Sequence, residues 1–214
     1  DDALTETIEG QTFNSEVTTY TDKVKVGYKL DRVETIPLII TTGENKIKVY
    51  YVTDNTQTKN ISYTVEYYKD GKLIDRVIEE DTVHVLEEKI TVRKDKINIT
   101  DMYEGYSFVN TEPENIPDTV TDGTIIKVNY EIKDDLSYTI KYVDPDTNKD
   151  IKPEEIKNGL TYGDKVTENA PDIDGYTKVN PEESITIGTD ENVIIFYYTK
   201  RTDLTYKVEY YFEG

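Results

Sequence analysis

The residues best placed to do chemistry lie between positions 144 and 155, where oxygen-bearing side chains recur at every second position. The set is Asp144, Asp146, Asn148 and Asp150, with Glu155 at the twelfth position. This is the ligand spacing of a calcium loop, but the sixth position of such a loop needs glycine and here it is Lys149. The set is therefore a calcium candidate, and the alternative is a hairpin loop between two strands.

The chain has few of the side chains that nucleophilic or acid-base catalysis needs. It has no cysteine, and His84 is its single histidine, so neither a Cys-His nor a Ser-His pair is at hand. In Val83-His84-Val85 the histidine takes the outward position of an alternating strand, and we expect it to be solvated. Acidic pairs such as Glu154-Glu155 lack the apolar setting that would raise a carboxyl pKa. We therefore expect no enzyme and no cofactor.

The composition excludes further classes of function. A formal net charge of −19 over 214 residues argues against nucleic acid and against direct contact with an anionic membrane. The absence of cysteine excludes disulfides, which suits small repeated modules of a Gram-positive cell surface better than disulfide-stapled metazoan domains. The 19 tyrosines, with many Thr, Val and Ile, favour a mainly β fold, α+β at most.

One segment returns along the chain and divides it. Asn60–Tyr68 has near copies at Asp135–Tyr142 and Asp203–Tyr211. Fixed-period self-similarity marks tandem modules. We predict a first repeat at 1–55 without its leading strand, repeats at 60–132 and 135–200, and the leading strand of a truncated fourth at 203–214. Such modules would form an elongated array, with the polar stretch 53–59 as its most mobile junction.

The copies alternate with period two, so each is a strand with one buried face. The expected inward sets are Tyr63, Val65 and Tyr67; Tyr138, Ile140 and Tyr142; and Tyr206, Val208 and Tyr210. Each repeat closes with a second such strand, whose inward sets begin at Ile47, Ile126 and Ile194. First and last strands should share one core.

Three Gly-Tyr pairs recur between those strands, at Gly27-Tyr28, Gly105-Tyr106 and Gly175-Tyr176. We expect each glycine to take a positive φ and each tyrosine to pack on the core. Helix is hard to find, and only short helical turns are expected, near 100–104 and 162–167.

With these motifs in view, the repeats resemble the MucBP (mucin-binding protein) repeats of Gram-positive surface adhesins. The third repeat carries the resemblance in order: Tyr138–Asp144, Tyr162-Gly163-Asp164, Ala170-Pro171, Gly175-Tyr176 and a closing strand that ends at Tyr198. The second repeat departs from it over 81–101. The B-repeat of internalin-like proteins is a rival, although the Trp usual after its Gly-Tyr is missing.

The resemblance implies tandem ubiquitin-like β-grasp modules in the stalk of an extracellular, cell wall-anchored bacterial adhesin. It implies contact with host mucin or other glycoproteins; the alternative is a pure spacer that presents a distal adhesive domain. In a β-grasp the first and last strands are parallel neighbours.

Outward-facing tyrosines are the candidate ligand-binding residues, namely Tyr50, Tyr68, Tyr197 and Tyr211. Exposed aromatic rings can stack on sugars, although cross-strand pairing within the sheet is the alternative.

The incomplete ends predict a second kind of partner. Because the first repeat lacks its leading strand, its closing strand should have an unpaired edge. Residues 203–214 form a strand of matching pattern with nothing to bury it. We expect this strand to pair with the first repeat of another copy, which joins chains head to tail.

Overall fold

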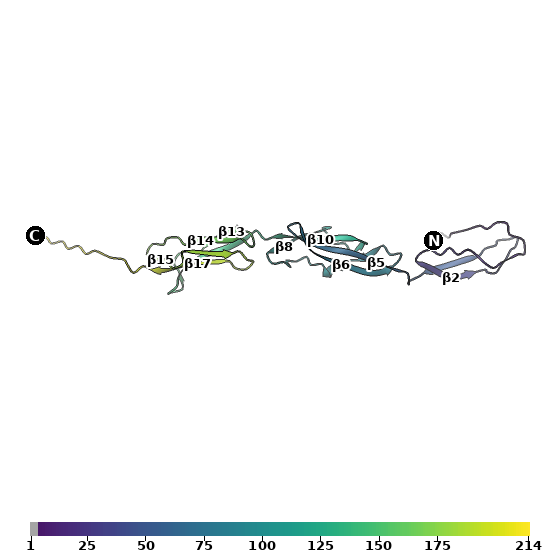
Figure 1. Cartoon of the computed structure of the whole chain (residues 1–214), viewed down its shortest axis with the longest axis horizontal. Coiled ribbons are helices and arrows are strands. Elements are labelled where there is room, and N and C mark those ends of the chain that lie inside the picture. Colours follow the sequence, from purple (N-terminus) through teal and green to yellow (C-terminus); the bar gives the residue numbers. More distant parts are fainter. Residues whose placement is uncertain (1–3) are drawn as a thin grey trace. The chain divides into compact units, whose positions relative to one another are not determined.

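The structure is a computed structural model that describes residues 4–214. Within those residues it consists of β-strands and turns, with one short 3-10 helix, η1 (Lys94–Lys96) (Figure 1). The mainly β expectation is confirmed. No helix in the described part of the chain is long and apolar enough to cross a membrane.

The strands fall into three successive groups along the chain. The first group is β1 (Glu16–Val17), β2 (Tyr28–Glu34), β3 (Leu38–Ile39) and β4 (Lys48–Thr53). The second is β5 (Thr58–Lys69), β6 (Lys72–His84), β7 (Lys89–Thr91), β8 (Tyr106–Glu112), β9 (Thr119–Thr121) and β10 (Thr124–Ile132). The third is β11 (Leu136–Asp144), β12 (Lys149–Asp150), β13 (Glu155–Leu160), β14 (Lys165–Asn169), β15 (Tyr176–Lys178), β16 (Glu182–Thr186) and β17 (Val193–Lys200).

The chain forms two compact units. The first unit holds the residues up to 64 together with 78–92 and 117–125, and the second holds 65–77, 93–116 and 126–214. The division runs through β5, β6 and β10, each of which contributes residues to both units. The four repeats expected from the sequence are a different division of the chain, and they stay a prediction.

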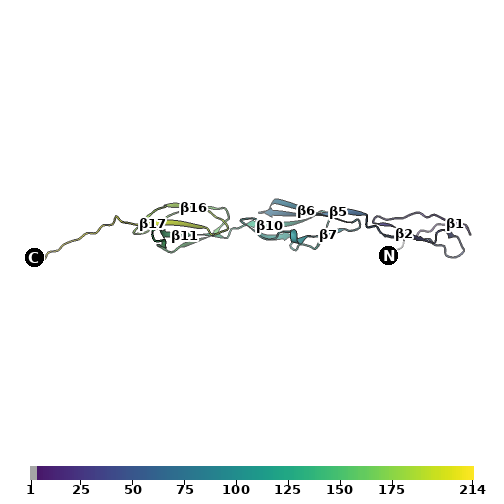
Figure 2. The same ribbon diagram turned by 90° about the horizontal axis from the view of Figure 1, so that it is seen from below.

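Two antiparallel pairings recur three times in the same chain order. The small sheets β1-β3, β7-β9 and β14-β16 are one series. The pairs β2-β4, β8-β10 and β15-β17 are the other (Figures 1 and 2). The structure is therefore a set of several small sheets built on one repeated pattern, as tandem β-grasp-like modules require.

The closing strand of the third group lies beside its opening strand. The sheet order is β12-β11-β17-β15, and β13 also pairs with β11. Strands β11 and β17 are parallel, with Ile140 opposite Ile194 and Tyr142 opposite Phe196. This confirms the expected parallel pair. In the second group β5 is likewise the neighbour of β10, in the order β6-β5-β10-β8.

The inward faces predicted from sequence form the core in the second and third groups, where an opening strand (β5 or β11) lies beside a closing strand (β10 or β17). Tyr63 and Tyr138 are 1% and 5% exposed, and the closing residues Tyr130 and Tyr198 are 1% and 0% exposed. The first group differs, because β4 pairs with β2 alone among the described strands. Its inward residues Ile47, Val49 and Tyr51 are consequently only half-buried.

Local turn chemistry agrees with the sequence in one place and corrects it in others. Asp70 and Gly71 have φ of 46° and 74°, the two positive values of a type I′ hairpin. The helical turn expected at 162–167 is wrong, because β14 begins at Lys165; the segment 100–104 is irregular. The stretch 53–59, expected to be the most mobile junction, contains a hydrogen-bonded turn, in which Gln57 N donates to Asp54 O at 3.0 Å; its mobility stays a prediction.

Burial of tyrosine hydroxyls makes the stability of the fold sensitive to alkali. The Tyr130 hydroxyl donates to Asn98 O at 2.9 Å, and burial raises the pKa of Tyr130 to about 12. An unfolded tyrosine has a pKa of about 10. A folded pKa above the unfolded one means that this stabilisation is complete below about pH 10 and is lost as the pH rises to about 12.

We therefore predict that the free energy of unfolding, measured with urea from pH 7 to 12, falls above about pH 10. Tyr130→Phe should lower stability at pH 7 by about 1 kcal/mol through the lost hydrogen bond. It should also make the alkaline decline shallower than in the parent chain. A decline equally steep in both proteins would contradict the assignment.

Candidate functional site

The calcium candidate is built as a hairpin turn. Asp144 is 5% exposed, and its Oδ1 accepts the backbone N–H of Asp146 at 2.9 Å. Asn148 donates its own N–H to the Asp144 carbonyl at 2.8 Å and has a φ of 56°. The Asp144 carboxylate therefore caps the turn between β11 and β12, as Asp commonly does in loops.

Glu155, the twelfth residue of the candidate set, is held by a different group of partners. It accepts hydrogen bonds from Lys152 Nζ at 2.8 Å and from the Tyr142 hydroxyl at 3.0 Å. These two donors, Lys152 first, lower the pKa of Glu155. Burial, and then the same carboxylate, raise the pKa of Tyr142. Among the described residues no three acidic or histidine side chains are grouped so that they could hold a metal ion.

His84 is not the solvated residue expected from its strand position. Its ring is half-buried, with Nδ1 accepting the Leu86 N–H at 3.3 Å and Nε2 lying 3.1 Å from Asp54 O. Since Nδ1 accepts, Nε2 carries the proton and donates to the carbonyl. Sequence alternation could not reveal this role, because Asp54 belongs to a turn thirty residues earlier in the chain.

Two of the candidate tyrosines are already engaged by their own chain. Tyr50 is half-buried: the Arg32 guanidinium lies 3.9 Å from its ring centre, and its hydroxyl donates to Glu34 at 3.0 Å. That hydrogen bond is the main cause of the lowered pKa of Glu34. Tyr68 is also half-buried and donates to Glu66 at 2.6 Å, which raises the pKa of Tyr68.

The other two candidates present more surface. Tyr197 on β17 is 37% exposed, and Tyr211 in the irregular C-terminal segment is 85% exposed. The Tyr211 hydroxyl donates to Glu209 at 2.6 Å. Tyr50 belongs to the first unit, and the other three candidates belong to the second. Ligand binding by these tyrosines stays a prediction.

A buried carboxylate on the outer face of β5 was missed by the sequence. Glu66 was expected to point outward, yet it is 7% exposed. It accepts from Tyr68 and from Arg76, whose Nη2 lies 3.2 Å away. A buried carboxylate needs such partners. Only the pairing of β5 with β6 brings Arg76 across the hairpin.

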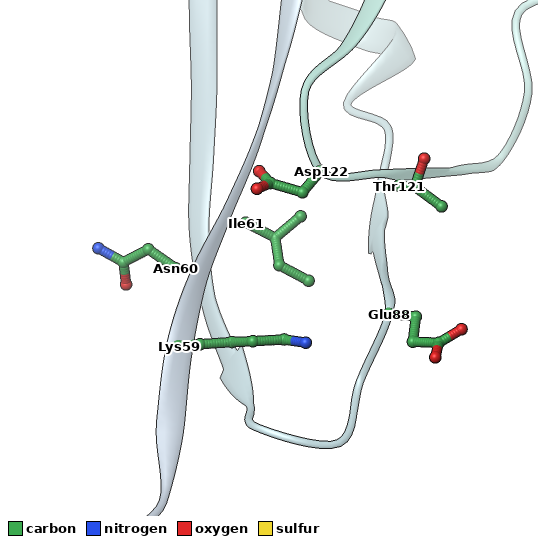
Figure 3. Close-up of a pocket in the computed structure, with 6 residues that line it drawn as sticks. All are labelled: Lys59, Asn60, Ile61, Glu88, Thr121 and Asp122. Carbon is green, nitrogen blue, oxygen red and sulfur yellow. The ribbon is translucent and has the colours of Figure 1, made fainter.

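A shallow hollow of about 340 Å³ lies at the start of β5 (Figure 3). Lys59 and Ile61 point into it from the strand, while Asn60 points away (Figure 3). Opposite them, Asp122 accepts the Ser62 N–H at 2.8 Å. The Asn60 amide is itself bonded to Glu80 at 2.9 Å and to Thr82 at 2.9 Å. The hollow is lined by one lysine, two carboxylates (Glu88 and Asp122) and the hydroxyl-bearing Thr121.

The three Gly-Tyr pairs share one backbone arrangement. Their glycines have φ of 85°, 76° and 80°, which confirms the expected positive values. Each glycine carbonyl accepts, at 2.9 Å, the N–H of the residue that follows a closing strand. These pairs are Asp54 to Gly27, Lys133 to Gly105 and Arg201 to Gly175. We call the side of each such glycine on which a Cβ would lie the glycine seat.

Two of the glycine seats are covered by a side chain from the next strand group. Within the first unit a Cβ on Gly27 would overlap Leu86, and within the second a Cβ on Gly105 would overlap the Tyr162 ring. A backbone hydrogen bond lies beside each covering side chain: Val85 N donates to Gln57 O at 2.9 Å, and Tyr162 N donates to Lys133 O at 2.8 Å. Gly27 and Gly105 must therefore be glycine for two reasons: each has a positive φ, and each lies too close to a neighbouring side chain to carry a Cβ.

The tyrosines of the pairs are less buried than expected. Tyr176 is partly buried against the core of the third group, and Tyr106 is half-buried beside the Lys69 ammonium, 4.4 Å from its ring centre. Tyr28 is 37% exposed, so the expectation that it packs on a core is wrong. Among the described strands, β4 of the first group pairs with β2 alone, so no second strand packs beside it to bury this tyrosine.

No protein family and no curated protein sequence matches the chain. Among solved structures it is similar to the type 2 repeat of the mucus binding protein MUB from Lactobacillus reuteri, at 11% identity and a TM-score of 0.26, covering 66% of this chain and 100% of that one. It is also similar to Mub-RV, at 16% identity and a TM-score of 0.23, covering 66% and 99%.

A third likeness is to Streptococcal High Identity Repeats in Tandem (SHIRT) domains 3-4 from a cell surface protein. The identity is 14% and the TM-score 0.30, and the match covers 64% of this chain and 96% of that one. The first and third of these structures are described as repeats. At these TM-scores the likenesses carry no argument about a ligand.

The glycine seats give a matched pair of substitutions. Gly105 and Gly159 both have a φ of 76°, but only the Cβ at Gly105 would meet a neighbour. Gly159→Ala should lose about 1 to 2 kcal/mol of unfolding free energy through backbone strain alone. Gly105→Ala should lose more, and Tyr162→Ala in that background should recover part of the difference. Equal losses in the two alanine variants, measured by urea unfolding, would contradict the seat.

Proposed function

We propose that this chain is the repeat region of a bacterial cell-surface adhesin and serves as an extracellular stalk. It is not an enzyme in this proposal, and its parent protein is anchored to the cell wall. The sequence resemblance to MucBP repeats supports the proposal, and so does the recurrence of the same strand pairings. Host mucin or another glycoprotein is the proposed partner.

The observation that best supports a stalk is the parallel pairing of β11 with β17. Five residue pairs, from Thr139 with Val193 to Val143 with Tyr197, form its register. Because the strands are parallel, the chain enters the group at one end of the pair and leaves at the other. Tension on the termini therefore loads these hydrogen bonds in shear, and several must break together, each worth roughly 1 kcal/mol.

Pulling single molecules by their ends tests the stalk. We expect the third repeat to open at a higher force than the first, since among the described strands β4 pairs with β2 alone, whereas β17 pairs with both β11 and β15. The chain has no cysteine, so Lys141→Cys with Ile195→Cys, which are opposite in the register, marks the third repeat. Oxidation should remove its opening step, and reduction should restore it. A third repeat that opens at a force no higher than the first would contradict the mechanical role of the parallel pair.

Glycoprotein binding is the second candidate function, and the exposure of Tyr197 and Tyr211 favours it. Rings of this kind stack on sugars. In a titration on immobilised mucin we expect weak saturable binding that falls in Tyr197→Ala with Tyr211→Ala. Phe212→Ala, at a residue that is 92% exposed, is the control and should bind as the parent does. The absence of a saturable signal would leave the chain as a spacer.

A further inference from the structure

The third sheet has one face on the core and a second face turned away from it, which we call the outer face. On β11 and β17 the outer residues alternate with buried ones and form three rows across the parallel pair. These rows are Thr139 with Val193, Lys141 with Ile195, and Val143 with Tyr197. Beside the first row, Ile156 of β13 stands opposite Thr139 and is 58% exposed. Five of these seven side chains are aliphatic or aromatic.

The equivalent face of the second sheet is polar. When the inward residues of the two sheets are aligned, Glu66 takes the position of Lys141, and Lys127 takes that of Ile195. Glu66 is bonded to a tyrosine and an arginine, as described above, and Lys127 Nζ donates to Glu112 at 3.0 Å. The fold pattern shared by the two sheets therefore does not require an apolar outer face on the third.

A cation stands at the centre of this apolar face. Lys141 is half-buried and makes no ion pair with any residue that the structure describes. The chain has 44 acidic residues against 25 basic ones, so a lysine without an acidic neighbour is exceptional in it. A charge that is partly removed from water is stabilised by an opposite charge. The outer face thus fits a partner surface that is largely apolar and supplies a carboxylate close to Lys141.

The same face of a second copy meets both requirements. Asp150 on β12 is exposed and stands opposite Val143, so it borders the row of Val143 and Tyr197. A two-fold axis that crosses the strands between this row and the row of Lys141 and Ile195 lays each row over the other row of the partner. Ile195 then packs on the partner's Tyr197, and Lys141 comes beside the partner's Asp150. Symmetry makes both contacts twice.

We propose that two copies of this chain pair face to face through the outer faces of their third sheets. Stacked sheets lie about 10 Å apart with their strands nearly aligned, a separation that aliphatic and aromatic side chains fill. The net charge of −19 on each chain opposes pairing. At physiological ionic strength, however, charges further apart than about 8 Å are largely screened.

The contact is isologous, so it closes as a dimer and does not extend into a filament. It goes beyond the proposed stalk and glycoprotein binding, because it joins two chains side by side and needs no ligand. Pairing also covers Tyr197, so a ring engaged in the dimer is not open to a sugar.

Sedimentation over a concentration series, in about 0.15 M salt, tests the pairing. The mass of the full chain should rise from monomer to dimer and no further. Ile195→Lys, which introduces the residue that β10 carries at the equivalent position, should abolish the rise. Val109→Lys, the same charge change at a valine on β8 that is 43% exposed, should pair as the parent does. A parent that stays monomeric, or an Ile195→Lys variant that pairs like the parent, would overturn the proposal.

Charge reversal tests the arrangement within the dimer. Lys141→Glu and Asp150→Lys should each weaken pairing by about ten-fold, because each sets two like charges face to face. The double variant restores opposite charges and should recover most of the loss. Lys165→Glu, the same charge change at an exposed lysine on β14, is the control and should pair as the parent does.

Equal pairing by Lys141→Glu and Lys165→Glu would overturn the assigned contact, and so would a double variant that pairs no better than the single ones. Mucin binding is measured on the parent chain at concentrations where it is monomeric. Its absence would remove glycoprotein binding and leave the dimer intact, so the two proposals fail independently.

Discussion

The structure depends on one constraint, that the opening and closing strands of a repeat lie side by side and turn their tyrosine and aliphatic faces to the same side. Where both strands are present, Tyr138, Ile140, Ile194 and Phe196 are at most 5% exposed. On β4, which among the described strands pairs with β2 alone, the same residue types stay half-buried. A small module without disulfides has few other sources of stability, so the strand pair decides whether a repeat has a core at all.

The features that could be predicted from sequence are those fixed by neighbours in the chain. Alternation identified the inward faces of β5 and β11, and Asp70-Gly71 identified the type I′ hairpin, because period and turn chemistry are local. The positive φ of each Gly-Tyr glycine followed from the same kind of argument.

The features that escaped prediction involve partners brought together only by the fold. Glu66 alternates like a surface residue, but Arg76 and Tyr68 surround it. His84 has the pattern of a solvated residue and instead bonds a carbonyl thirty positions away. In the polar stretch 53–59, the side chain of Gln57 accepts the Gly27 N–H at 2.9 Å and donates to the Tyr28 carbonyl at 3.2 Å. The polar composition of the stretch does not reveal these partners, which lie about thirty residues earlier in the chain.

The glycine seat has a consequence for how such a chain can change over generations. The seat is made of backbone, and it accepts leucine at Gly27 and tyrosine at Gly105. A junction that fixes the main chain and tolerates different side chains places little demand on the identity of its neighbours. Recombination could therefore insert or delete a whole repeat without the simultaneous changes that a side-chain-specific interface would need. The number of repeats is then free to vary while each junction keeps the same hydrogen bonds.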